Sequence, residues 1–101
     1  MNQAPKQLNI ELGEKESEGI YANLALITHS PSEFIIDFAR VLPGTPKSKI
    51  YARIVMTPQH IRLLQNALEE NVKKYEGRFG KINLVGKEDE KDIGFHVKKA
   101  E

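Results

Sequence analysis

The sequence predicts one α+β domain, in which a four-stranded antiparallel β-meander is followed by one long amphipathic helix and a weakly structured C-terminal tail. Three observations carry this prediction: four segments with a strand-like apolar pattern, short turn-forming links between them, and one later segment with a helical apolar period. The 101 residues suffice for one domain. We expect residues 1–6 to be a disordered N-terminus, 7–80 to form the domain, and 81–101 to be a polar, partly mobile extension.

The first two predicted strands differ in their number of apolar faces. Leu8, Ile10 and Leu12 alternate with polar residues, which is typical of a strand with one face toward a core. Residues 20–29 are apolar on both faces, and such strands are usually buried on both sides. One face would carry Ile20, Ala22, Leu24 and Leu26, and the other Tyr21, Ala25 and Ile27.

Residues 33–42 and 48–56 predict the third and fourth strands, because apolar residues occupy alternate positions in both segments. Turn signals stand before and between them, at Pro31 and at residues 43–46. Short links of this kind favour antiparallel pairing of consecutive strands, which gives a meander.

Asp37 interrupts one apolar face of the third predicted strand. Opposite charges on facing strands stabilise a register, so we predict an ion pair with Arg53 or with Arg40 across the sheet. A role as a general acid or base needs a pocket and a second group, and neither is visible in the sequence.

A helix is predicted from Pro58 to Glu76. Thr57 is suited to cap its free backbone amides, and a proline at the first helical position loses no hydrogen bond. Gly77 is expected to end the helix. Apolar residues recur every three or four positions and form one stripe of Ile61, Leu64, Leu68, Val72 and Tyr75, which Leu63 and Ala67 are expected to widen.

The predicted sheet has more apolar surface than one chain covers. A single helix is about 10 Å across, whereas four strands span roughly 15–20 Å, so the helix covers about half of one face. We therefore expect a homo-oligomer, and a two-fold dimer is the commonest closed assembly. The candidate oligomer face comprises Tyr21, Ala25, Ile27, Ile35, Ala39, Val41 and Val55, or else the alternate set on the other side of the sheet.

The composition argues against several classes of protein. Fifteen basic and 14 acidic side chains give a net charge of +1, which argues against a bulk attraction to nucleic acid or anionic membranes. There is no cysteine, so disulfides, thiolate chemistry and cysteine-ligated metal sites are excluded. No apolar run approaches the ~20 residues of a membrane span, and the first residues lack an apolar signal segment. We expect a cytoplasmic protein.

No catalytic or metal-binding pattern stands out. His29, His60 and His96 lack the spacing of metal ligands, and we predict no cofactor and no enzymatic activity. The leading hypothesis is a homo-oligomeric protein- or peptide-interaction module. The alternative is a nucleic-acid-associated accessory protein that uses a basic stripe after the helix, formed by Lys73, Lys74, Arg78, Lys81 and Lys87.

Three short motifs carry a resemblance to a known family: Tyr21-Ala22-Asn23, the Ser-Pro-Ser-Glu-Phe run at 30–34, and Met56-Thr57-Pro58. Over residues 8–80 the chain resembles a widespread prokaryotic family catalogued as a domain of unknown function, numbered three-four-six-seven. The resemblance implies a fold and no functional residues.

At fold level the chain is also similar to the export chaperone SecB, through its meander, its doubly apolar sheet and the helix that begins with Pro58 and His60. That similarity implies assembly through sheets and helices and binding of unfolded chains. The chain lacks the later helices and the acidic tail of that chaperone, so the analogy concerns the fold alone.

Overall fold

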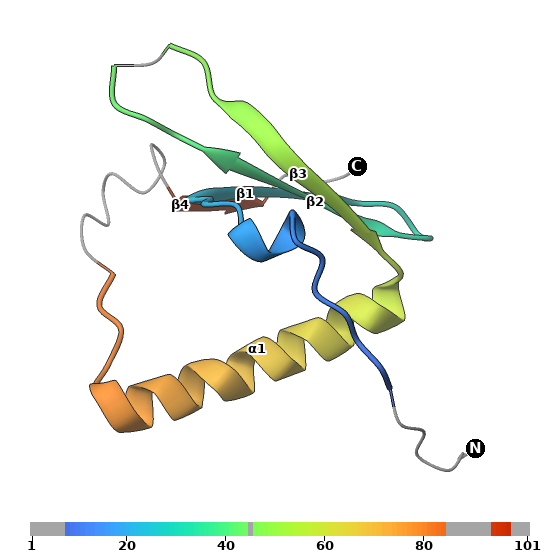
Figure 1. Ribbon diagram of the computed structural model, residues 1–101, viewed down its shortest axis with the longest axis vertical. Coiled ribbons are helices and arrows are strands. Elements are labelled where there is room, and N and C mark those ends of the chain that lie inside the picture. Colours follow the sequence, from blue (N-terminus) through green and yellow to red (C-terminus); the bar gives the residue numbers. More distant parts are fainter. Residues whose placement is uncertain (1–7, 45, 85–93, 98–101) are drawn as a thin grey trace.

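A computed structural model describes residues 8–44 and 46–84, and the backbone of residues 94–97. Three strands come first, β1 (Leu24–His29), β2 (Phe34–Arg40) and β3 (Lys49–Met56), and each pairs antiparallel with the next. The helix α1 (Pro58–Phe79) follows and lies to one side of the sheet as a separate layer (Figure 1). The predicted α+β class, with an antiparallel sheet followed by one long helix, is confirmed.

The first predicted strand is wrong, so three strands rather than four precede the helix. Residues 8–12 form no strand, and the side chains of Leu8, Ile10 and Leu12 are 76%, 83% and 74% exposed. An alternating pattern gives a strand only where a neighbouring strand offers unpaired backbone groups. Within the described residues, this segment has no such neighbour; it leads instead into a turn and a short 3-10 helix at Glu16–Glu18.

A further strand, β4 (Gly94–Val97), pairs with β1 in parallel. The strand order is therefore β3-β2-β1-β4, with β3 at one edge. This strand lies within the extension that we expect to be polar and partly mobile, and its backbone joins the sheet. Residues 1–6, for which we expect disorder, and most of the rest of the extension lie outside the described residues.

The predicted start of the helix is confirmed and the predicted end is wrong. The Thr57 hydroxyl oxygen accepts a hydrogen bond from the backbone N–H of His60 at 3.2 Å, and Pro58 takes the first helical position. The helix passes through Gly77 and ends at Gly80, whose φ of +101° is left-handed. A glycine inside a helix costs only about 0.5–1 kcal/mol, so Gly77 alone does not stop it.

The ion pair predicted for Asp37 forms with Arg53, which lies directly opposite on β3. The guanidinium donates two hydrogen bonds to the carboxylate, at 2.7 Å and 2.9 Å, and Asp37 is buried. The alternative partner, Arg40, instead donates to the backbone carbonyl of Tyr21 at 3.3 Å.

The hydrogen bond from Arg53 to Asp37, and then the charge of that carboxylate, raise the pKa of Arg53. A cation whose pKa rises on folding stabilises the fold below its unfolded pKa, and loses this effect only as the pH rises through the folded value. Arg53 therefore stays charged and paired throughout the neutral range.

The buried apolar core of the described residues is small. It consists of Ala25, Ile36 and Ala39, at 2%, 8% and 2% exposure. No residue of α1 is buried. The described part of one chain therefore leaves the larger apolar side chains of both layers in contact with water.

Candidate docking groove between the helix and the sheet

The side of the sheet that faces α1 is apolar. Residues opposite one another on paired strands point to the same side, and the register pairs Ala25 with Phe38, and Ile36 with both Ile27 and Ile54. These five residues come from β1, β2 and β3, so the apolar surface runs across all three antiparallel strands. A helix could pack on this apolar surface.

An apolar groove of about 540 Å³ separates this face from α1. Only Thr57 stands between the last residue of β3 and the first of α1, so the helix leaves directly from the edge of the sheet. Its first half lines the groove, and the polar side chains in the lining are Arg62 and Gln65. The lining residues are Ala25, Ile27, Phe34, Ile36, Phe38, Pro58, Ile61, Arg62, Leu64, Gln65 and Leu68.

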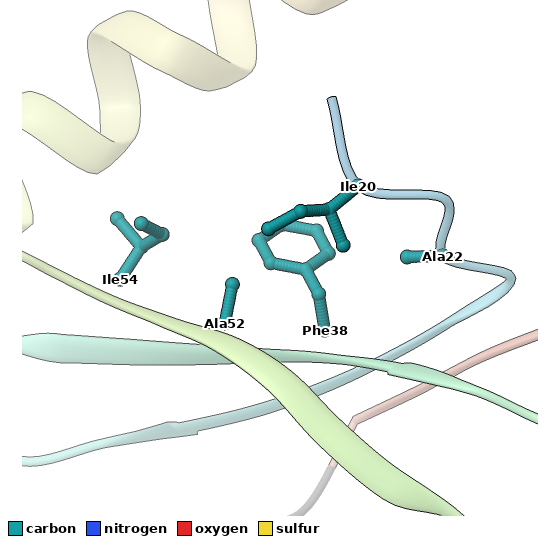
Figure 2. A pocket seen from close by; sticks show the side chains of 5 residues that line it. All are labelled: Ile20, Ala22, Phe38, Ala52 and Ile54. Carbon is teal, nitrogen blue, oxygen red and sulfur yellow. The ribbon is translucent and has the colours of Figure 1, made fainter. Parts of the chain in front are cut away.

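A second hollow of about 380 Å³ adjoins the groove on the same face of the sheet. Figure 2 shows Phe38, Ala52 and Ile54 rising from the strands on the helix side, with Ile20 and Ala22 reaching in from the segment before β1. Because Phe38 lines both hollows, they form one continuous apolar surface.

Asn23 fixes the segment that carries Ile20 and Ala22. Its side-chain amide donates to the carbonyl oxygen of Val41 at 3.1 Å and accepts from the N–H of Val41 at 2.8 Å. Its own backbone N–H donates to the carbonyl oxygen of Ala39 at 3.1 Å. The Asn23 side chain thus makes the pair of hydrogen bonds that a neighbouring strand's backbone would otherwise make. The last residue of the Tyr-Ala-Asn motif therefore has a structural role.

The apolar stripe of α1 continues beyond the groove. Leu64 and Leu68 line the groove but remain 42% and 59% exposed. Farther along the helix, Val72, Tyr75 and Phe79 are 36%, 51% and 67% exposed, and Phe79 extends the stripe to the end of the helix. A surface helix normally buries such a stripe, but the described residues leave most of the stripe of α1 exposed.

The structure divides the predicted oligomer face between the two sides of the sheet, so those residues do not form one surface. Ala25 and Ile27 face the groove, whereas Ile35 and Val55 form a pair on the opposite side, which Ala39 shares. The other two members, Tyr21 and Val41, lie outside the strands.

The division arises from the register between β1 and β2, in which odd-numbered residues of β1 pair with even-numbered residues of β2. A separate shift of the alternation precedes β1. Residues 20 and 22 share the groove side with residues 25 and 27, so the alternation shifts by one residue between them. The chain bends there, at Asn23, and an uninterrupted period-two pattern does not anticipate that bend.

The predicted basic stripe is exposed but interrupted. Lys73, Lys74 and Arg78 belong to α1 and Lys81 follows it, while Lys87 lies outside the described residues. The same stretch, residues 69–81, includes three glutamates against four basic residues, so its net charge is +1. This mixed surface gives little support to a nucleic-acid interface.

Metal chemistry and membrane insertion find no support in the described residues. No group of three or more histidine, aspartate or glutamate side chains there could hold a metal ion. The histidines in this part take local roles: His29 stacks on Phe34 at a ring distance of 5.3 Å, and the His60 ring contacts the Thr57 hydroxyl at 2.8 Å. No helix in this part is both long and apolar enough to cross a membrane.

Comparison with known proteins gives one match. A family described as "Protein of unknown function (DUF3467)" matches residues 1–84, which include the first three strands and α1 but not β4. No curated protein and no solved structure matches the chain. The similarity to SecB therefore stays a prediction.

Proposed function

Since the chain belongs to the DUF3467 family, whose description names no activity, we propose on physical grounds that it is a homodimeric protein-interaction module whose two α1 helices pack antiparallel. One observation carries the proposal. The helix has 22 residues and a continuous apolar stripe, yet none of its residues is buried. Helices in proteins owe most of their stability to the packing of such a face, so a second copy of the stripe is the covering that we propose.

The exposed area is of the right order for a dimer. Side chains of this size that are about half exposed leave on the order of 100 Å² each. The five exposed stripe residues from Leu64 to Phe79 therefore offer roughly 500 Å² per copy, and a standard interface buries about 800 Å² per partner. Flanking residues would supply the remainder.

The stripe is complementary to itself, because its residues are placed almost symmetrically about position 70. In an antiparallel pair centred there, Ile61 would lie opposite Phe79 of the partner subunit, and Leu68 opposite Val72 of the partner subunit. Each large side chain would then meet another apolar side chain. A two-fold interface requires this kind of self-complementarity.

Charges beside the stripe favour the same arrangement. Arg62 and Glu76 lie along one margin of the stripe, eight residues before and six residues after its centre. In the antiparallel pair Arg62 would therefore lie near Glu76 of the partner subunit, once on each side of the axis. Neither side chain forms an ion pair within the described part of its own chain. Rim charges of this kind fix register more than affinity.

A single cysteine tests this pairing, because the natural chain has none. Asn71 lies at the margin of the stripe, one residue from its centre, so the two copies of this residue would be close together. Asn71→Cys should therefore give a disulfide-linked dimer under mild oxidation. Asn66→Cys, the same substitution at an exposed position on the far side of the helix, is the matched control and should stay monomeric on a denaturing gel. Sedimentation of the untreated protein at tens of micromolar should give twice the mass of the chain.

Two results would count against the proposal. A sedimentation mass equal to one chain would rule out the dimer. A dimeric mass in which Asn66→Cys cross-links as readily as Asn71→Cys would show that the helices do not pair through the stripe.

A further inference from the structure

We propose that residues 8–12 of one copy add as an extra antiparallel strand to the free edge of β3 in another copy. The inference goes beyond the helix pairing and rests on different residues. It joins two features that the described part of one chain leaves unsatisfied: a strand-like segment without a neighbour and an edge strand without a cover.

The donor segment, residues 8–12, has the apolar alternation of a strand, but its apolar side chains are largely exposed to water. Leu8, Ile10 and Leu12 alternate with Asn9 and Glu11, and the three apolar side chains are 74–83% exposed. The segment makes no backbone hydrogen bond within the described part of the chain. Solvent-exposed tails usually contain few large apolar residues. The pattern therefore points to a partner strand that can form backbone hydrogen bonds with this segment.

The acceptor is β3, which hydrogen-bonds to β2 on one side and lies along the margin of the sheet (Figure 1). Proteins usually keep edge strands short, covered or strongly charged. β3 has eight residues, and its side chains Ile50, Ile54 and Val55 are 43%, 44% and 54% exposed. Its outer N–H and C=O groups are therefore available to an added strand, which is a common mode of peptide recognition.

Charge selects the orientation. The donor segment runs into an acidic stretch, in which the glutamates at positions 14, 16 and 18 outnumber Lys15, whereas β3 begins beside Lys47 and Lys49. An antiparallel strand would bring the glutamates of one copy to these lysines and would place Leu8 near the far end of β3. Arg53 adds little to this attraction, because Asp37 already neutralises it.

A second copy fits the donor better than its own chain does. In its own chain the donor segment enters the sheet through β1, β2 lies between β1 and β3, and Asn23 holds the entry to Val41. If each copy gives its segment to the other, the exchange closes as a two-fold pair and does not propagate.

A spin label measures the contact directly. The full chain with Asn9→Cys, carrying a nitroxide, would be mixed with nitrogen-15-labelled natural protein, so that broadening reports only contacts between copies. We expect the amide signals of β3 to lose intensity, most strongly toward Val55 and least toward Lys49. The amides of β1, which lies two strands farther from the label, should lose less intensity than those of β3. At 1 M salt, where screening acts over about 3 Å, the loss should diminish.

The control is the same labelled chain with Ile10→Pro, because proline removes a ladder donor and its ring obstructs the added strand. This variant should leave β3 unbroadened. Ile10→Pro combined with Asn71→Cys in an otherwise natural chain should still form the disulfide, so loss of strand addition and loss of helix pairing are distinguishable.

Two outcomes would overturn the inference. One is the absence of broadening on β3 between copies. The other is broadening of β3 only when the label and nitrogen-15 are on the same chain, which would place the strand on its own sheet.

Discussion

The sheet and the helix of this chain are stabilised in opposite ways. The three antiparallel strands have paired backbones, a bidentate ion pair between Asp37 and Arg53, and the buried side chains of the core. The helix has a cap at each end and no buried residue between them. The comparison shows that the described part of this chain completes the sheet internally and leaves the apolar stripe of the helix uncovered.

The largest effect is expected on self-association, from a substitution in the helix stripe. Leu68→Glu should weaken self-association by at least 100-fold, because it places two charges in the centre of an apolar interface. Leu63→Glu is a close match, since Leu63 is 55% exposed and Leu68 is 59% exposed. Leu63 lies on the opposite side of the helix, so the same change there should leave the dissociation constant within about threefold of its natural value.

Sedimentation equilibrium over a range of concentrations measures both variants, and circular dichroism at high concentration checks that each folds. If Leu63→Glu dissociates the protein as strongly as Leu68→Glu, the helix does not use the stripe. Equal behaviour of both variants and the natural chain would show that the stripe is not an interface.

The Asp37–Arg53 pair should have a smaller effect, on the stability of the sheet. Asp37→Asn keeps the shape of a buried residue but removes its charge, and should lower the free energy of unfolding by about 1–3 kcal/mol. Replacing both residues, Asp37→Leu with Arg53→Met, should restore most of the loss, because it removes the buried carboxylate together with its partner and leaves no unpaired polar group. Urea unfolding followed by circular dichroism gives both values. A double variant less stable than Asp37→Asn would show that the pair is stabilising beyond its volume.

Prediction from sequence worked where the cause of a structure lies within a few residues or across one strand pair. Thr57 caps the helix as expected because the N-cap motif needs only the next helical turn. Asp37 pairs with Arg53 because a charge in an apolar strand has few ways to be satisfied.

Prediction failed where structure depends on residues that are distant in the chain. The pattern at residues 8–12 is that of a strand, but a strand also needs a neighbour with unpaired backbone groups, which no local signal reveals. The predicted oligomer face is divided because odd-numbered residues of β1 pair with even-numbered residues of β2, a register that the sequence does not reveal. The groove was missed because the sequence indicates an apolar face on the helix and another on the sheet, and not the gap between them. β4 was not predicted within the expected polar extension, because four residues after a charged stretch give too short a pattern.

The smallest expected effects are changes in the free energy of unfolding, and their signs differ between Gly77 and Gly80, the two glycines near the end of α1. Gly77 is helical, has no positive φ and has no atom within 4 Å of the place where an alanine methyl group would lie, so Gly77→Ala should raise the free energy of unfolding by about 0.5–1 kcal/mol. Gly80 has equal space but a φ of +101°, so Gly80→Ala should lower stability by at least a similar amount. Helix content by circular dichroism, measured with thermal unfolding at one fixed concentration, checks both. Changes in stability of opposite sign for the two variants would place the end of the helix at Gly80. A loss of stability in Gly77→Ala would instead place the end of the helix at Gly77 and remove Phe79 from the stripe.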